Sequence, residues 1–543
     1  MNRKVLSLLL AILMVLSVVL AGCSGKSSGE TSSTDSAAKE GGSSDKTLRL
    51  AIKSDIPDLD PARMSDNQSS FVASQVFQTL VDVNNAGEVV GEAAEKFEHN
   101  EDYSVWTFTM RDGLTFSNGN PLTAETVKLS WLRAISPELN SGQVERFFPI
   151  KGAKAYAEGT GTAEEVGLVV KDEKTLEVTL EQGDPSFPDQ ASYATFAIVD
   201  PEVVKDPEWM TKPESYIGSG PYVLDAYNLG SDLQFSKNEK YYDAANVDVE
   251  KISVELIEDE NTVYRKFVNG ELDHVGSPVH TIAQDVIDEA QKSPSYRQLD
   301  NLAVYWFKLN TEDPQLSNVH LRKALAYSVD RQTIIDNITK GGQRPALGYV
   351  PQFNTQGFKD NDVDTAKQEL ATALSELGLS DASGLTLTLK YNSSDAHQKI
   401  AQALQEQWKQ KLGINIELHN EEWNVYLESL RNSDYQIGRL GWGADITDPA
   451  DFLKMYKEKE GDNNQTHWAN ENFQAKLDEA NQSFGDDAKR ESLLKEAEAI
   501  MLEDMPVIPL YFNTAPSLTN FDRVDTLEIN LLGQLLVKYV KMK

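Results

Sequence analysis

The sequence has a single cysteine, Cys23, in 543 residues. A disulfide bond needs two cysteines, so the folded part of the chain contains no internal disulfide. Its stability must therefore come from the burial of apolar side chains, which a chain of this length can supply. The length also exceeds that of a usual single hydrophobic core, and we expect two or more domains.

The chain has fewer basic residues than acidic residues. The chain has 51 Lys and Arg residues against 85 Asp and Glu residues, which gives a formal net charge of −34. Binding to nucleic acid or to anionic lipid headgroups needs basic surface patches, so this balance argues against both. Acidic and lysine-rich stretches such as 457–462 are interpreted as solvated surface.

Motifs of common catalytic and metal sites are missing as well. None of the seven histidines belongs to a His-Glu-x-x-His sequence or to another close metal-ligand spacing. The tight turn at 217–222 contains no Gly-x-Ser-x-Gly nucleophile motif. Gly159-Thr160-Gly161 lacks the third glycine and the preceding strand of a dinucleotide-binding loop, and it is predicted to be a surface turn. We therefore expect neither an enzyme nor a cofactor.

An apolar run extends from Val5 to Leu20, after Arg3 and Lys4. It is shorter than the ~20 residues of a membrane-spanning helix, and its basic start predicts a secretory signal peptide over residues 1–22. The run ends in Leu-Ala-Gly-Cys, which resembles the lipobox of bacterial lipoproteins. This resemblance implies cleavage before Cys23 and a lipid on its thiol. An uncleaved anchor, or an ordinary signal peptide with an incidental cysteine, is the alternative.

Residues 24–45 are rich in Ser, Gly, Thr and Ala and show no apolar periodicity. Such a composition is typical of a flexible tether. Residues 23–46 are thus predicted to hold a lipidated cysteine and a tether to the folded body. The two acyl chains of a diacylglycerol suffice for stable anchoring, so we expect the protein at the outer face of the cell membrane.

Alternation of apolar residues predicts the first elements of the folded part. It indicates a strand at 47–52, a proline-containing loop at 56–62 and a helix after 66–70. Alternation on both sides of Asp112-Gly113 predicts a β-hairpin of 105–110 with 114–116. Thr123 is expected to cap the helix that follows.

The second half of the chain shows a strand, helix and strand pattern. Strands are predicted at 385–389 and 414–418, with a helix at 396–412 between them, which indicates a parallel pair. A further strand at 301–310 places Tyr305 and Phe307 on one face and Trp306 on the other. A helix is predicted at 491–502, and a proline-flanked strand follows it.

One segment, Arg439-Leu-Gly-Trp-Gly-Ala-Asp445, concentrates side chains with binding chemistry. The guanidinium of Arg439 offers planar donors to a carboxylate, Asp445 accepts hydrogen bonds from an ammonium group, and Trp442 provides a flat apolar wall. Together they suit a zwitterionic, partly apolar ligand. A buried ion pair beside a core tryptophan is the alternative interpretation.

The same segment resembles the signature of the oligopeptide- and dipeptide-binding receptors of bacterial ABC importers. Residues 106–125 and 217–222 resemble this family too, and the likeness extends over nearly all of 47–543. It implies that Asp445 holds the amino terminus of a peptide, that Trp442 lies at the cleft and that Arg439 is available to a peptide carboxylate. The family usually has an aromatic residue where Ile446 stands, a departure that alters the neighbouring pocket but not the anchor.

Further ligand-binding residues are predicted from the resemblance and from their places next to expected strand and helix ends. Asn67 and Gln68 begin the first helix, where capping is the alternative role. For the aromatic candidates, packing within the fold is the alternative. The remaining candidates are Trp306, Trp423, Tyr426, Tyr511 and Asn513.

The resemblance implies an α/β fold of the two-lobe periplasmic-binding-protein type, with a hinge and an extra small domain. The first lobe is expected to comprise 47–77, 200–300 and 514–543, the small domain 78–199, and the second lobe 301–513. The implied partners of a monomeric receptor are an oligopeptide and the subunits of an ABC permease. Receptors for oligosaccharides or nickel complexes share this fold, and a pheromone sensor, adhesin or surface chaperone is a further alternative.

Overall fold

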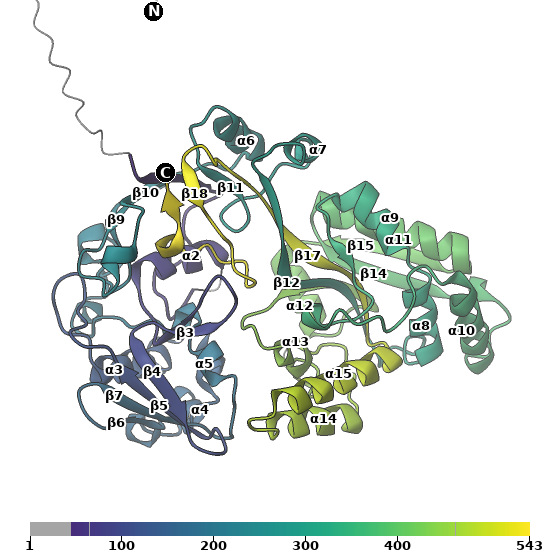
Figure 1. The fold of residues 1–543 in the computed structure, drawn as a ribbon. Coiled ribbons are helices and arrows are strands. Elements are labelled where there is room, and N and C mark those ends of the chain that lie inside the picture. Colours follow the sequence, from purple (N-terminus) through teal and green to yellow (C-terminus); the bar gives the residue numbers. More distant parts are fainter. Residues whose placement is uncertain (1–44, 65, 462) are drawn as a thin grey trace, which may run out of the picture. The chain divides into compact units, whose positions relative to one another are not determined.

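The computed structural model of the protein describes residues 45–64, 66–461 and 463–543. The predicted signal peptide, the predicted lipid site Cys23 and the tether up to residue 44 lie outside these residues. From Lys46 to Lys543 the chain forms one compact unit with three larger β-sheets (Figure 1). Each of these sheets packs against a hydrophobic core of its own.

The sheet of the first lobe combines strands that are far apart in the sequence. The alternating segment 47–52 forms β1 (Thr47–Ile52), as predicted, and buries Leu48 and Leu50. The strand order is β1, β10 (Lys251–Leu256), β9 (Asp232–Lys237) and β8 (Tyr222–Asn228). Helix α2 (Asn67–Val76) starts after its N-cap Asp66 and buries Val72 in the same core.

The end of the chain also packs into the core of the first lobe. Val524, Val537 and Met542 are buried there, among the residues of β1 and β8. Two short strands, β18 (Val524–Thr526) and β19 (Lys541–Met542), pair beside this core. The C-terminal segment is therefore part of the first lobe, to which β1 also belongs.

The small domain has a separate antiparallel sheet. Its strand order is β4 (Ala94–His99), β5 (Val105–Met110), β7 (Thr175–Thr179) and β6 (Leu168–Val170). Helix α3 (Ala124–Ala134) packs on β6 and β7 and buries Trp131. As predicted, Thr123 caps α3, because its hydroxyl accepts a hydrogen bond from the backbone N–H of Thr126. A hairpin of β2 (Val81–Val83) and β3 (Val89–Gly91) precedes this sheet.

The predicted β-hairpin across Asp112-Gly113 is wrong. β5 pairs with β4 on one edge and with β7 on the other, so 114–116 has no free edge to join. Those residues turn at Asn118-Gly119 instead, where the N–H of Phe116 donates to the carbonyl of Asn120 over 2.9 Å. Gly119 has a φ of 95°, which glycine adopts readily. Pairing of β5 with β4 and β7 thus replaced the pairing with 114–116 that local alternation suggested.

The largest sheet builds the second lobe. Its strands follow the order β11 (His274–Gly276), β17 (Val507–Thr519), β12 (Tyr296–Leu309), β16 (Ile437–Gly443), β14 (Thr386–Asn392) and β15 (Asn415–Glu421), and β13 (Arg344–Pro345) also pairs with β17. The predicted strand, helix and strand unit is confirmed, because β14 and β15 are parallel and α11 (Asp395–Leu412) connects them.

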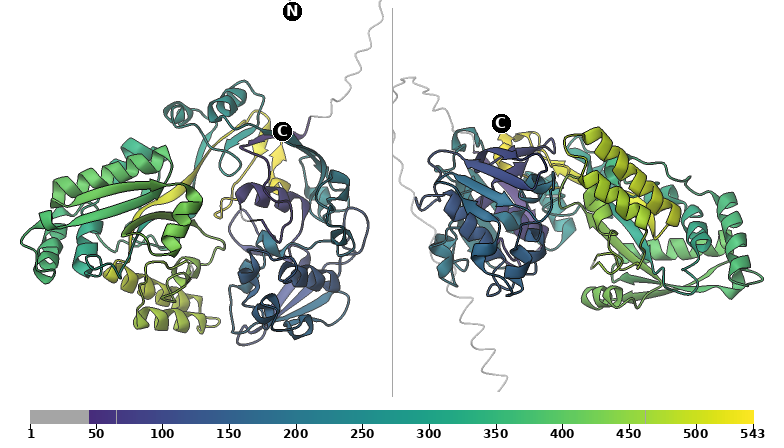
Figure 2. Two further views of the ribbon diagram at one scale, coloured as in Figure 1. Left: turned by 180° about the vertical axis from the view of Figure 1, so that it is seen from behind. Right: turned by 90° about the horizontal axis from the view of Figure 1, so that it is seen from below.

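The two faces of this sheet carry different helices (Figure 2). Tyr305 and Phe307 of β12 are buried in a core with α8 (Val319–Tyr327), α10 (Val363–Glu376) and α11. Trp306 is buried in another core with α13 (Ala450–Lys454), α14 (Glu471–Asn481) and α15 (Asp487–Asp504). The alternation predicted for β12 is therefore confirmed, and the predicted helix 491–502 lies within α15.

Strands β12 and β17, 14 and 13 residues long, are shared by both lobes. At one end, 296–300 pairs with 514–518 next to β11, and at the other 304–308 pairs with 507–512 next to β16. A register shift between Asp300 and Val304 separates the two ends. The chain thus has the two-lobe α/β fold with a hinge and an extra small domain, while the exact domain boundaries given above stay a prediction.

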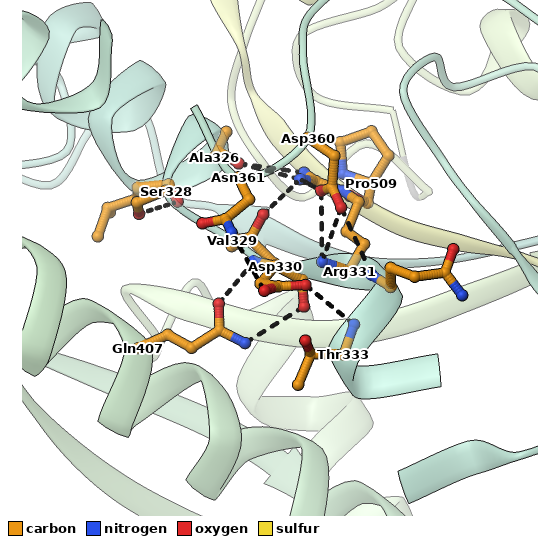
Figure 3. A network of polar contacts seen from close by, with 12 residues as sticks. Ala326, Ser328, Val329, Asp330, Arg331, Thr333, Asp360, Asn361, Gln407 and Pro509 are labelled. Carbon is orange, nitrogen blue, oxygen red and sulfur yellow. Dashed lines mark hydrogen bonds and ion pairs between the residues drawn. The ribbon is translucent and has the colours of Figure 1, made fainter. Parts of the chain in front are cut away.

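Arg331 fastens β17 to the helices of the second lobe (Figure 3). This side chain, at the start of α9 (Arg331–Ile334), is fully buried. Its Nε donates to the carbonyl of Pro509 in β17 over 2.8 Å, and both terminal nitrogens donate to the carbonyl of Ala326 over 3.2 Å. Nη1 also pairs with the Asp360 carboxylate at 3.1 Å. One guanidinium therefore joins three separate segments of the lobe.

Five shorter helices complete the fold: α4 (Ala153–Ala157), α5 (Phe187–Gln190), α6 (Glu260–Val268), α7 (Ile287–Ala290) and α12 (Trp423–Arg431). Across the part of the chain that the structure describes, no helix has the length and apolar character needed to cross a membrane.

Candidate ligand-binding site

The signature segment forms the end of β16 and the turn into α13. In β16, Arg439 stands opposite Phe307 of β12, and Trp442 stands opposite Val304. Because neighbouring positions of a strand face opposite sides of the sheet, Arg439 and Trp442 point in opposite directions. The Arg439 guanidinium lies over the ring of Tyr305 at 4.5 Å, whereas Trp442 packs against the core that contains α13 to α15. The structure therefore separates these two predicted residues.

Asp445 follows the end of β16, and 24% of its side chain is exposed. Its Oδ2 lies 2.9 Å from Nη1 of Arg146, which belongs to the 3-10 helix Val144–Phe147 of the small domain. Arg146 is itself held by Gln143, at 2.8 Å, and by the ring of Tyr193, 3.8 Å from the guanidinium carbon. Burial lowers the pKa of Arg146, but the charges of Asp445 and Tyr193 raise it overall.

Asp451 holds the signature segment through two hydrogen bonds. Its Oδ2 accepts a hydrogen bond from the Trp442 indole N–H and another from the backbone N–H of Asp445, each at 3.1 Å. Burial, followed by the negative charge of Asp445, raises the pKa of Asp451 to about 7. This carboxylate thus fixes both the tryptophan and the loop that carries the predicted anchor.

Asp445 lines a cavity of about 220 Å³. Asn67, in the first turn of α2, lines the same cavity, so the structure brings these two predicted residues together. Tyr193 of the small domain and Lys538 near the C-terminus also contribute to the wall. Further lining residues are Ser70, Phe71, Ser74, Phe77, Gln78 and Leu536. The cavity is therefore bounded by both lobes and has polar and apolar walls.

Arg439 belongs to a second cluster, together with the predicted residues Tyr426 and Tyr511. The hydroxyl of Tyr426 donates to the Arg439 carbonyl over 2.6 Å, and Tyr511 stacks on Tyr305 at 4.9 Å. Nη1 of Arg439 donates to Asn392 over 3.2 Å. Among the residues described, Arg439 forms no ion pair and its buried Nε has no hydrogen-bond partner. This cation therefore has unused capacity for an anion.

Four other predicted residues lie apart from the cavity of Asp445. Trp306 was expected at the cleft, but its indole is fully buried and packs edge-on against Tyr349, so it belongs to the core. Trp423 is 42% exposed at the start of α12. Gln68 follows the cap of α2, and Asn513 is partly exposed on β17. None of these four residues lines that cavity.

Three residues of the site were not predicted. Arg146 and Tyr193 come from the small domain, far from the signature in the sequence, and no motif marks them. Asp451 stands six positions after Asp445 in the same segment, at the first turn of α13. Its position after the Asp448-Pro449 pair is the one local signal that could have indicated it.

Two further carboxylates of the small domain, those of Asp189 and Asp184, contact the segment after Asp445. Oδ2 of Asp189 accepts hydrogen bonds from the backbone N–H and the hydroxyl of Thr447, at 2.7 and 2.6 Å. Burial raises the pKa of Asp189 to about 6. The Asp184 carboxylate lies 3.6 Å from Nζ of Lys454. The loop that carries the predicted anchor is therefore held by the small domain at several points.

The arrangement offers the chemistry of binding. A partly exposed carboxylate lines the cavity, and the Trp442 indole bonds to the neighbouring Asp451. Arg439 lies on the same strand as Trp442 and forms no ion pair with any described residue. In the ranges 45–64, 66–461 and 463–543, no cluster of three or more His, Cys, Asp or Glu side chains is placed to hold a metal ion.

Comparison with known proteins identifies the family to which this sequence is similar. The model of the bacterial extracellular solute-binding proteins, family 5 middle region, matches residues 88–464. The oligopeptide-binding protein OppA of Bacillus subtilis strain 168 is 38% identical over 518 residues, which cover 93% of this chain and 94% of that protein.

Solved structures show the same similarity. A periplasmic oligopeptide-binding protein of an ABC transporter from Borrelia burgdorferi is 30% identical, with a TM-score of 0.75 over 92% of this chain and 100% of that chain. OppA of Listeria monocytogenes bound to peptide is 25% identical, with a TM-score of 0.72 over 92% of this chain and 99% of that chain.

Proposed function

Because the chain belongs to the bacterial extracellular solute-binding proteins of family 5, we propose that it is a receptor that binds oligopeptides and delivers them to an ABC permease. The relatives that support this proposal are named for oligopeptide binding, and one was solved with a peptide bound. The two lobes close on the ligand by a hinge motion, for which the shared strands β12 and β17 provide the connection.

The position of Asp445 carries this proposal. Its carboxylate is partly exposed and lines the cavity just after the end of β16, where it can accept hydrogen bonds from the ammonium group of a peptide. Trp442, which does not line the cavity, is proposed to reach the ligand's first residue in the closed state, and Asn67 lines the cavity from α2. Arg439 remains available to a peptide carboxylate because it forms no ion pair within the described residues. These roles are proposals for this chain.

Binding in this mode tolerates many peptide sequences. Main-chain groups of an extended peptide supply hydrogen bonds that do not depend on its side chains. Water in roomy pockets can bridge to side chains of different size. Gln68, Trp423 and Asn513 are proposed to contact such a ligand in the closed state. Tyr426 and Tyr511 are buried, and they are proposed to position Arg439, Tyr426 through the Arg439 carbonyl and Tyr511 through Tyr305.

The receptor is proposed to act at the outer face of the cell membrane as a monomer. The support is the sequence of residues 1–46, with its signal peptide pattern, Leu-Ala-Gly-Cys motif and tether composition. Lipid on Cys23 would hold the folded body close to the permease. Solute binding, not catalysis, is the class of activity that the family implies.

The test is the melting temperature of the protein with different classes of ligand. A ligand that binds the native state raises the melting temperature by mass action. We expect alanine peptides with a free amino terminus to raise it, and the N-acetylated forms of the same peptides to raise it much less. A series of lengths identifies the preferred peptide size.

Oligosaccharides and nickel salts are the contrasting ligands of this experiment. A shift with a sugar or with nickel, and none with any peptide, would contradict the proposed ligand while leaving the fold unchanged. A shift with free and acetylated peptides alike would keep peptide binding and remove the role of Asp445.

A further inference from the structure

Asp451 is partly buried, and its carboxylate bonds to Trp442 and to the backbone of the predicted anchor but to no cation among the described residues. Its Oδ2 receives the indole N–H of Trp442 and the backbone N–H of Asp445, each over 3.1 Å. Both donors are neutral groups. These hydrogen bonds therefore do not neutralise the negative charge of Asp451 when its carboxyl group is ionised.

The charges around Asp451 are unbalanced. Asp445 is already paired with Arg146 at 2.9 Å, and Lys454, the cation on the helix of Asp451, lies 3.6 Å from Asp184. Tyr193 and Tyr349 are the other titratable side chains that face Asp451. Within the described residues Asp451 itself forms no ion pair. Of these two neighbouring carboxylates, Asp445 alone is paired with the Arg146 guanidinium.

The energetic consequence is a carboxyl group that holds its proton near neutral pH. Burial and the charge of Asp445 raise the pKa of Asp451 to about 7, although the hydrogen bonds from Trp442 and Asp445 and the charge of Lys454 act in the opposite direction. A second cation at Asp445 would lower the pKa of Asp451, because a nearby positive charge favours the ionised carboxylate.

We propose that Asp451 is the second carboxylate of the amino-terminus anchor, and that it releases its proton to water when a peptide's ammonium group joins Arg146 at Asp445. This inference rests on the proposed peptide binding. In the unliganded state one carboxylate faces one cation. In the liganded state the ionised carboxylates of Asp445 and Asp451 balance the charges of Arg146 and the peptide's ammonium group. The repulsion between the two cations is therefore offset by two negative charges and not by one.

The experiment measures the Kd of tetra-alanine between pH 7.5 and 5.5 for the wild type and for Asp451→Asn. Because a group with a pKa of about 7 must give up its proton, wild-type affinity should fall about twentyfold over this range. The asparagine oxygen can still accept both hydrogen bonds but cannot titrate. The variant should therefore bind weakly and with little dependence on pH.

Isothermal titration in buffers of different ionisation enthalpy adds a direct readout. At pH 6 the wild type should release about one proton for each peptide bound, and Asp451→Asn should release almost none. Asp225→Asn is the matched control. Asp225 is exposed on β8, accepts a hydrogen bond from Ser236 over 3.0 Å and does not line the cavity, so this variant should keep the proton release.

A second variant, Trp442→Phe, makes the test independent of whether Asp451→Asn folds. It removes an indole donor that lowers the pKa of Asp451, so the midpoint of the pH dependence should move upward. Wild-type binding without proton release, or an unchanged midpoint in Trp442→Phe, would overturn the inference. A wild type that binds no free-amine peptide at any pH would instead overturn the proposed function.

Discussion

At the scale of single residues, buried charges near the C-terminus are paired with side chains from distant parts of the chain. Nζ of Lys538, near the C-terminus, lies 2.6 Å from Asp82 and 2.7 Å from Glu92, and Tyr241 donates to Glu92 over 2.7 Å. An unpaired buried charge costs several kcal/mol, so such contacts fix how the C-terminal segment packs on the first lobe. His274 is buried without any charged partner among the described residues.

His274 should make the protein less stable in acid. Its ring bonds to the Thr519 hydroxyl and to the Ser277 carbonyl, and burial lowers its pKa to about 4. The unfolded chain takes up a proton near pH 6.5, so stability is lost as the pH falls from 6.5 towards 4. Between pH 7 and 5 this linkage amounts to ~2 kcal/mol. Urea denaturation at both pH values measures it.

The variant His274→Asn should lose less stability between pH 7 and pH 5 than the wild type. His419→Asn is the control, because His419 is exposed and 54% of its side chain is accessible. The same pH dependence in the wild type and His274→Asn would show that this histidine does not carry the effect.

Residue-scale prediction from the sequence had a clear limit. Asp445 could be singled out because it stands in a recognisable segment, but its partner Arg146 and the neighbouring Tyr193 could not. They reach the site only through the folding of the small domain, and no local pattern encodes such a contact. Trp306 was assigned to the cleft from the family resemblance, and alternation placed it on the face opposite Tyr305 and Phe307 without saying what covers that face.

At the scale of elements, sequence patterns predicted several strands and helices in both lobes. β1, β14, α11, β15 and β17 lie where alternation or helical spacing indicated them. Pairing was less predictable, and the hairpin at Asp112-Gly113 was wrong because β4 and β7 occupy both edges of β5. Sequence patterns identify a strand from its own residues, whereas its partners depend on segments far along the chain.

The attachment of β17 to its helices should depend on Arg331. Replacing Arg331 by Met removes the donor to the Pro509 carbonyl and leaves the Asp360 carboxylate without its cation. Breaking a buried ion pair by removing one partner costs ~3 to 5 kcal/mol, and we expect a loss of this size. Guanidinium chloride denaturation measures the change in the free energy of unfolding.

Arg265→Met provides the matched control for this substitution. Arg265 lies on α6 with 66% of its side chain exposed, and it pairs with Asp259 at 3.5 Å. Its removal should change stability little, because exposed ion pairs contribute little. Equal stability of Arg331→Met and the wild type would contradict the structural role given to Arg331.

At the scale of the whole molecule, two lobes share the strands β12 and β17 and together surround one cavity. The resemblance of the signature and scaffold segments predicted this fold correctly. It could not predict which side chains meet in the cavity, because that depends on how α2, the small domain and the C-terminal segment pack. The net charge of −34 is consistent with a receptor for a ligand with a positively charged end.

The central claim is that Asp445 holds the amino terminus of a peptide. A thermodynamic cycle that combines the substitution of Asp445 with N-acetylation of the peptide tests it most directly. Isothermal titration gives the Kd of tetra-alanine and of its N-acetylated form for the wild type and for Asp445→Asn. We predict that acetylation costs the wild type ~2 to 5 kcal/mol of binding free energy and costs Asp445→Asn almost nothing. Equal binding of the free and acetylated peptides to the wild type would contradict the account.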